Sequence, residues 1–235
     1  MDKDDQILKK IIKLLTKNNI NFWICHGTLL GIIREKRLLP WDRDIDIAVW
    51  DHETDRDFVA EIFEKEGFKQ EYFFADVDSL HFSRVGKNID INFFKKNNTI
   101  ASWKGAVAMD GFFNKLIIHF GHIVNLDDLK KIEFPNNKFK RFAYLFFIIL
   151  VLLLRLLSPN FLKDRIYQSA LKRIKYFGYS YPIESLELKK MDYKGFEIQV
   201  PNDPEKCLEL TYGVNWKTPK KDYIWHKDAS NLVKG

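Results

Sequence analysis

Thirteen consecutive apolar residues, from Phe142 to Leu154, constrain this chain more than any other feature of its sequence. Such a run leaves no polar face, so a helix formed from it must be surrounded by protein or by lipid on all sides. Residues 142–157 would form a helix of roughly 24 Å, which is shorter than the ~30 Å hydrocarbon core of a bilayer. The run therefore predicts either a buried core helix or a helix that dips into one leaflet, rather than a full span.

The residues around this run are strongly basic. Residues 138–175 contain nine lysines and arginines and the single acid Asp164, a net charge of +8, whereas the whole chain carries +6. A basic protein can indicate nucleic acid, but basic residues concentrated beside an apolar run are typical of a membrane surface. We therefore expect an anionic membrane surface as a partner, and no nucleic acid. A second, basic helix is predicted after residues 158–160, with these residues on one face: Leu162, Ile166, Ala170, Ile174 and Phe177.

The cysteine content and the N-terminus bear on the compartment. Two cysteines, Cys25 and Cys207, exclude a disulfide framework and a cysteine-based zinc cluster. The first five residues include three acids and do not resemble a signal peptide. We expect a cytoplasmic protein that lies peripherally, as a monotopic protein, on the inner face of the cell membrane.

The hydrophobic periodicity alternates between helix and strand along the chain. This pattern predicts an α+β fold, with a mixed β-sheet flanked by helices and an apolar plus basic helical insertion. The predicted parts are a catalytic core over residues 1–137, the insertion over 138–177, and the C-terminal part of the catalytic domain over 178–235. Helices are predicted over 7–15, 27–36, 55–66, 142–157 and 206–212, and strands over 22–25, 45–49, 80–85, 89–94, 100–118 and 196–200.

The chemistry-bearing residues centre on two acids, Asp44 and Asp46. If they begin a strand, both carboxylates point to one face of the sheet while Ile45 points into the core. Two carboxylates held so close repel each other unless a cation lies between them. Mg²⁺ is the natural occupant, because it takes one or two carboxylates together with substrate phosphates and water.

A third carboxylate is usually needed to complete such a site, and Asp90 is the best candidate. It lies in an alternating strand, so it faces away from the core if Ile89 and Ile91 face inward. If Asp90 does not serve, Asp76 and Asp78 are the next candidates. The alternative interpretation is a solvated loop over residues 42–46, with Asp90 as an edge-strand charge that discourages aggregation.

Three residues upstream of the acids suit a phosphate. Gly27 lets the backbone approach a phosphate closely, and Thr28 adds a hydroxyl at a helix N-terminus. Arg34 can add a bidentate contact. His26, just before the predicted turn, is more simply explained as a structural hydrogen-bonding residue. The glycine, hydroxyl, arginine, acid pair and later strand acid occur in the order that a phosphate and metal site requires.

At these residues the chain resembles the LicD family, which includes bacterial phosphorylcholine transferases, fukutin and fukutin-related protein. The resemblance is carried by residues 22–31, Arg34 and residues 40–47, and it returns more weakly over residues 196–226. Asp44 and Asp46 match the acid pair of the family, and Asp90 its later strand acid. Arg43 stands where many bacterial members have an acid, which leaves the choice of donor open.

The resemblance implies a nucleotidyltransferase-type fold and a Mg²⁺ (or Mn²⁺) ion bound by Asp44, Asp46 and Asp90. It also implies transfer of a phospho-alcohol, such as phosphocholine or phosphoribitol, from a CDP-linked donor. The acceptor would be a hydroxyl of a glycan or lipid-linked glycan, and CMP would leave. In the C-terminal block, Tyr212 and His226 are expected to contact substrate.

Two alternatives stay open at this stage. A true nucleotidyltransferase would use the same acids but would release pyrophosphate. A non-catalytic protein would bind a membrane surface through its basic helices and would retain the acids without using them.

Overall fold

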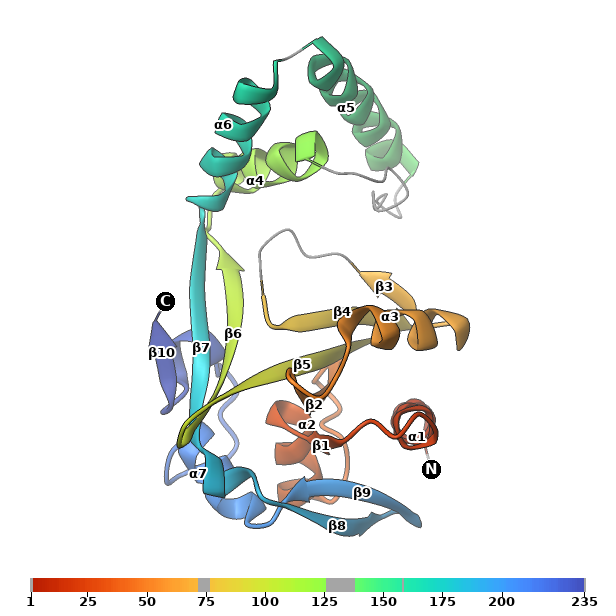
Figure 1. Ribbon diagram of the computed structural model, residues 1–235, viewed down its shortest axis with the longest axis vertical. Coiled ribbons are helices and arrows are strands. Elements are labelled where there is room, and N and C mark those ends of the chain that lie inside the picture. Colours follow the sequence, from red (N-terminus) through yellow and green to blue (C-terminus); the bar gives the residue numbers. More distant parts are fainter. Residues whose placement is uncertain (1, 72–76, 126–137, 158, 235) are drawn as a thin grey trace. The chain divides into compact units, whose positions relative to one another are not determined.

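A computed structural model of the protein describes residues 2–71, 77–125, 138–157 and 159–234 (Figure 1). The chain divides into two compact units. The first comprises Met1–Glu71, Val77–Gly105 and Phe177–Gly235, and the second comprises Tyr72–Asp76 and Ala106–Tyr176. Most of the predicted insertion, residues 138–177, falls in the second unit, and its boundaries as a domain stay a prediction.

A mixed sheet forms the frame of the first unit. Its path runs β1-β2-β5-β6-β7-β10, and β3 and β4 branch from β5. β2 and β5 are parallel, whereas β1–β2, β4–β5 and β5–β6 are antiparallel, so the predicted mixed α+β architecture is confirmed. The strands are β1 (Phe22–Ile24), β2 (Asp44–Trp50), β3 (Lys69–Glu71), β4 (Ser79–Arg84), β5 (Lys87–Asn97), β6 (Ile100–Ala108), β7 (Ile174–Pro182) and β10 (Leu232–Lys234).

Side chains along β2 and β5 alternate between the two faces of the sheet, and one face is anchored in the core. Ile45 and Ile47 on β2, and Ile89 and Ile91 on β5, are fully buried in the main hydrophobic core. Their neighbours in sequence face the other side of the sheet, because successive side chains in a strand alternate. β4 and β5 form a hairpin whose tight turn contains Val85 and Gly86, which agrees with the strands predicted over 80–85 and 89–94.

Helices and a small second sheet complete the first unit. α1 begins with a capping box in which the side chains of Asp2 and Asp5 each accept the other's backbone N–H. The predicted helices over 7–15, 55–66 and 206–212 are confirmed. The elements are α1 (Lys3–Lys17), α2 (His26–Leu30), a π-helical turn η1 (Gly31–Glu35), α3 (Arg56–Lys65), a 3₁₀ turn η3 (Ile183–Leu186), β8 (Leu188–Tyr193), β9 (Phe196–Pro201), α7 (Pro204–Tyr212) and α8 (Trp225–Asp228).

The entry into α2 differs from the prediction. A glycine turn at Gly27 was expected, but the left-handed residue is His26, with a φ of 46°. Gly27 lies inside the helix, so the glycine serves for close approach rather than for backbone conformation. The helix then widens into η1, and Lys36 ends it in a left-handed conformation.

Three helices make up most of the second unit: α4 (Phe112–Asn125), α5 (Lys138–Leu157) and α6 (Asn160–Leu171). They share a small core of Ile123, Val124, Ile148 and Val151, with Ile166 of α6 packed against it. Two predictions are wrong here. Residues 112–118 are helical rather than a strand, and the helix expected to reach Phe177 ends at Leu171, so that Ile174 and Phe177 lie in β7.

Much of the apolar surface of α5 is exposed. Ile148 and Val151 are buried, whereas Phe142, Phe146 and Leu157 are largely exposed. Within the described ranges no helix is both long enough and apolar enough to cross a membrane.

Candidate active site

The acids predicted from the sequence lie on two neighbouring parallel strands. Asp46 of β2 is the register partner of Asp90 of β5, and Asp44 is opposite Asn88. Because the isoleucines between them face the core, the three carboxylates share the other face of the sheet. The structure therefore brings Asp44, Asp46 and Asp90 into one acidic cluster.

Asp46 is the centre of this cluster. Burial raises the pKa of its carboxyl well above the ordinary value, and the charges of Asp90, Asp42 and Asp44 raise it further. A hydrogen bond from the backbone N–H of Thr28 opposes this shift. Burial and three neighbouring acids destabilise the ionised form of this carboxyl. A bound cation would offset that destabilisation.

Thr28 and Asp46 exchange two hydrogen bonds, one donated by each residue. The Asp46 N–H donates to Thr28 Oγ1 at 2.8 Å, while the Thr28 N–H donates to the Asp46 carboxylate. Thr28 is buried, with 2% of its surface exposed. The hydroxyl that the sequence assigns to substrate thus holds the start of β2 in this structure.

Gly27 leaves space for a fourth acid that sequence reasoning did not include. A Cβ at position 27 would clash with Asp42 Oδ2 and would lie 3.5 Å from Asp46 Oδ2. Burial raises the pKa of Asp42, although the backbone N–H of Asp44 offsets part of the rise. The buried Lys87 ammonium donates to the Asp42 carbonyl oxygen at 2.7 Å and fixes this loop. We missed Asp42 because nothing in a loop sequence indicates which way its side chain turns.

Two polar side chains engage the outer acids. Asn88 Nδ2 donates to Asp44 Oδ1 at 2.9 Å, and His81 Nδ1 lies 2.8 Å from Asp90 Oδ1. Burial lowers the pKa of His81, but the hydrogen bond and the charge of Asp90 outweigh burial, so the net shift is upward. A two-residue turn at Val85-Gly86 sets the register that pairs His81 with Asp90, so the sequence held a usable indication of this contact.

The donor set consists of oxygen atoms, which suits Mg²⁺ or Mn²⁺. In the arrangement described here, no three His, Cys, Asp or Glu side chains of the described residues are grouped so that they could hold a metal ion. Of the reserve candidates, Asp76 lies outside the described residues. Asp78 is buried and forms an ion pair with Lys95 at 2.6 Å and a longer one with Arg56 at 3.5 Å.

Arg34 lies in η1 and links the two blocks of sequence that carry the family resemblance. Its guanidinium donates to Glu35 Oε1 at 2.9 Å and to the carbonyl oxygen of Trp216 at 3.3 Å. The Arg34 Nε is buried, and it has no hydrogen-bond partner among the residues that the structure describes. One donor of this arginine thus holds the C-terminal block through Trp216, another contacts Glu35, and the buried Nε is left unsatisfied among the described residues.

Aromatic side chains pack around His26, the residue that precedes Gly27. His26 packs against Phe94, Trp103 and Tyr179, with ring centroids 4.8 to 6.1 Å apart. Both of its ring nitrogens are buried and, in the described part of the chain, without a hydrogen-bond partner; burial lowers its pKa to about 4. The expectation of a structural hydrogen bond from His26 is therefore wrong, since the ring packs as a neutral aromatic.

The two substrate residues predicted near the C-terminus lie beside these rings. Tyr212 ends α7, where Gly213 forms the C-cap, and its ring centroid lies 4.9 Å from that of Tyr223. Burial raises the pKa of Tyr212, and the charge of Asp46 adds to the rise, which places Tyr212 in the field of the acidic cluster. His226 of α8 contacts the ring of Phe177 at 5.4 Å.

Comparison with known proteins identifies the family. The model of the LicD/FKTN/FKRP nucleotidyltransferase domain matches residues 19–148 of this 235-residue chain. An uncharacterised protein of Rickettsia typhi is 47% identical over 53 residues, 23% of this chain and 17% of that protein. The ribitol-5-phosphate transferase FKTN of Mus musculus is 31% identical over 231 residues, 97% of this chain and 36% of that protein.

The chain thus spans about a third of the length of the fukutin relatives that it matches. Among solved structures, the lincomycin-bound lincosamide antibiotic adenylyltransferase LnuA is similar at a TM-score of 0.41 and 13% identity, covering 86% of this chain and 82% of that one. The matched family region contains Gly27, Thr28, Arg34 and all the acids of the cluster. The chain belongs to the LicD/FKTN/FKRP family.

Proposed function

We propose that this protein transfers a phospho-alcohol group from a CDP-linked donor to a hydroxyl of a glycan or lipid-linked glycan, releasing CMP, on a nucleotidyltransferase-type fold. The observation that carries the proposal is the pairing of Asp46 with Asp90 across parallel strands, with Asp44 and Asp42 beside them. Ribitol-5-phosphate transfer is named for the fukutin relatives, which supports a phospho-alcohol as the group transferred.

A divalent cation, Mg²⁺ or Mn²⁺, fits the donor set of this site. Asp46 would hold it together with Asp44 and Asp90, and the pKa of Asp46 is raised first by burial and then by the charges of Asp90, Asp42 and Asp44, all of which a cation would offset. When bound, the ion would neutralise charge that builds on the donor phosphates. Asp44 and Asp90 now contact Asn88 and His81, so cation binding would compete with these two hydrogen bonds.

The residues of the chain have separable tasks in this proposal. Thr28 holds the Asp46 backbone, and Gly27 leaves the space in which the Asp42 and Asp46 carboxylates approach each other. His81 Nδ1 lies 2.8 Å from Asp90 Oδ1, so the imidazole would be released once Asp90 binds a cation, and it could then accept the proton of the acceptor hydroxyl. Arg34 Nε is the donor available for a phosphate of the nucleotide.

The second candidate is a true nucleotidyltransferase that attacks the α-phosphorus and releases pyrophosphate. The acidic cluster serves both reactions equally, so product identity separates them. The third candidate is a protein that only binds membranes. The four buried or half-buried acids disfavour it, because such a cluster costs stability that a non-catalytic protein has no reason to retain.

We also propose that the second unit associates peripherally with an anionic membrane surface. The exposed apolar side chains of α5 and the +8 charge of residues 138–175 support this, since the two features suit acyl chains and anionic head groups respectively. A lipid-linked glycan acceptor would account for this association, and it would place the enzyme on the inner face of the cell membrane.

A thermal-shift experiment tests the catalytic proposal. CDP-choline, CDP-ribitol and CDP-glycerol are each added with and without Mg²⁺ to the wild-type protein and to Asp46→Asn. We expect a rise in midpoint that needs both the metal and one CDP-alcohol, and that is absent in Asp46→Asn. Metal-independent binding, or equal shifts in both proteins, would contradict the proposed site.

A further inference from the structure

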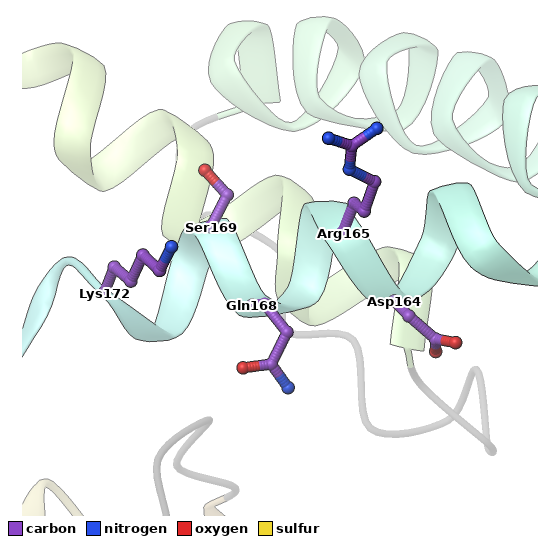
Figure 2. Close-up of a pocket in the computed structure, with 5 residues that line it drawn as sticks. All are labelled: Asp164, Arg165, Gln168, Ser169 and Lys172. Atoms are coloured by element: carbon purple, nitrogen blue, oxygen red, sulfur yellow. The ribbon is translucent and has the colours of Figure 1, made fainter.

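A small pocket lined by polar and charged residues lies on α6, in the second unit. It has a volume of about 260 Å³ and is lined by Asp164, Arg165, Gln168, Ser169 and Lys172 (Figure 2). This volume falls below the ~300–1,000 Å³ of pockets that enclose a drug-sized ligand. The pocket therefore suits a compact polar group rather than a whole nucleotide.

The cations of the pocket are uncompensated. Neither Arg165 nor Lys172 forms an ion pair with any residue that the structure describes. Asp164 also lines the pocket, but Figure 2 shows its carboxylate pointing away from the Arg165 guanidinium. Positions 165, 169 and 172 recur at helical spacing, which puts the two cations and the serine on one face.

A neighbouring arginine orients the serine. Arg173 Nη1 donates to Ser169 Oγ at 3.0 Å and to the Ser169 carbonyl oxygen at 2.5 Å. Because the Ser169 oxygen accepts this bond, its own hydroxyl hydrogen is directed to another acceptor. A cationic pocket with a hydroxyl donor prepared in this way is suited to an oxyanion with several oxygens, such as a phosphate.

Exposed apolar side chains in the same unit favour a lipid phosphate over a free one. The large apolar side chains at the end of α5 and the start of α6 are strongly exposed: Leu156 by 81%, Leu157 by 82% and Phe161 by 64%. Exposed apolar patches of this kind are rare on soluble surfaces without a partner. Lipid phosphates lie at the boundary between head groups and acyl chains, and a unit that carries both a pocket with two cations and exposed apolar side chains suits that boundary.

We propose that the α6 pocket binds the phosphate of an anionic membrane lipid, through Arg165, Lys172 and the hydroxyl of Ser169. This deepens the proposed membrane association and rests on it. The occupant is a lipid rather than nucleic acid, because a nucleic acid would leave the exposed leucines and Phe161 in water.

Vesicle flotation tests the proposal with charge-matched variants. The full-length protein is mixed with vesicles of phosphatidylcholine alone, or of phosphatidylcholine with phosphatidylglycerol. The pocket variant is Arg165→Gln with Lys172→Gln, and the control is Lys163→Gln with Lys175→Gln, which removes the same charge from outside the pocket. Each lost cation weakens binding about fivefold through the surface potential alone, so both variants lose about 25-fold and only the pocket variant loses more.

Ser169→Ala distinguishes binding through the pocket from general electrostatic attraction, because the substitution changes no charge. We expect about tenfold weaker binding to phosphatidylglycerol vesicles and unchanged binding to phosphatidylcholine. Equal losses in the two charge variants, with no effect of Ser169→Ala, would overturn the pocket while leaving membrane association intact. Phosphate-dependent chemical shifts that saturate with soluble glycerol 3-phosphate as tightly as with vesicles would overturn the lipid as the source.

The underlying membrane association has its own control. Replacing Leu156 and Leu157 by serine should weaken flotation with both kinds of vesicle, because it removes apolar contacts rather than charge. A wild-type protein that floats with neither vesicle would contradict the membrane association itself, and the pocket proposal with it. Thermal midpoints of all variants show that each one is folded.

Discussion

Thr28 and Asp46 hold each other through two hydrogen bonds of opposite direction, one of them 2.8 Å from the Asp46 nitrogen to the Thr28 hydroxyl oxygen. These two bonds hold the first turn of α2 against the start of β2 at the centre of the acidic cluster. Thr28 thus supports the position of Asp46, whether or not it also contacts a donor phosphate.

Thr28→Val tests this relationship, because valine keeps the shape of the side chain and removes the hydroxyl. We expect kcat to fall about 10- to 100-fold through misplacement of Asp46, with little change in the KM for the donor. Steady-state kinetics measure both constants, and Thr28→Ser is the matched control that restores the oxygen. A rise in KM at constant kcat would instead make Thr28 a substrate contact only.

Asp46→Asn should have opposite effects on stability and activity. In EDTA the thermal midpoint should rise, because the substitution removes one charge from four mutually repelling acids without changing volume. Turnover should fall at least 100-fold, since a lost metal contact costs several kcal/mol of transition-state stabilisation. A lower midpoint in EDTA would show that the acids of the cluster do not repel one another.

The position of the acids could be predicted because strand parity is a strict rule. Isoleucines at 45 and 47 must face the core, so Asp44 and Asp46 must face the other way, and the same holds for Asp90 between Ile89 and Ile91. The pairing of the two strands was not predictable from parity alone. It depends on the parallel register of β2 and β5, which long-range packing sets.

Other parts of the structure could not be predicted from the local sequence pattern. Residues 112–118 are rich in aromatic and β-branched side chains, which favour strands, yet they form the first turns of α4, whose later residues Ile123 and Val124 pack in the small core. Residues 174–177 continued the apolar spacing of α6 but pair in the sheet as β7 instead. Asp42 and the left-handed His26 lie in connections, whose side-chain directions leave no periodic pattern to follow.

Arg34→Ala should raise the KM for the nucleotide donor about tenfold and lower kcat less, if Arg34 Nε grips a phosphate equally in the ground and transition states. The same change removes the contact with the Trp216 carbonyl oxygen, so stability is expected to fall by about 1 kcal/mol. Arg34→Lys is the informative control, because lysine retains the charge without the Nε donor. An unchanged KM in both variants would leave Arg34 with a structural role alone.

Asp5, which lies outside the site, is expected to make the stability of the protein depend on pH. Its buried carboxylate accepts from Tyr193 Oη at 2.8 Å and from Lys194 Nζ at 2.6 Å. Burial raises its pKa, but these bonds outweigh burial and the net shift is downward. The stabilisation is therefore present above the ordinary carboxyl pKa of about 3.9 and is lost as pH falls through the lowered value.

Urea unfolding of the wild-type protein and Asp5→Asn measures this contribution. At neutral pH the variant should be less stable by about 2 kcal/mol, because the partners of a buried carboxylate lose their charge-assisted bonds. The difference should shrink once the pH falls below the folded-state pKa of Asp5. A difference that stays constant into acid would mean that the contacts do not depend on the charge.

The most direct test of the account is the product formed from a CDP-alcohol. Phosphorus NMR follows CDP-ribitol, CDP-choline and CDP-glycerol with Mg²⁺ and a mixture of glycan acceptors, using the wild-type protein, Asp44→Asn and Asp90→Asn. We expect the wild-type protein to release CMP from one of the three and to transfer the phospho-alcohol to the acceptor, and both variants to lose at least 90% of this rate, about one tenfold step or more. Release of pyrophosphate from CTP in place of CMP, or full activity in either variant, would contradict it.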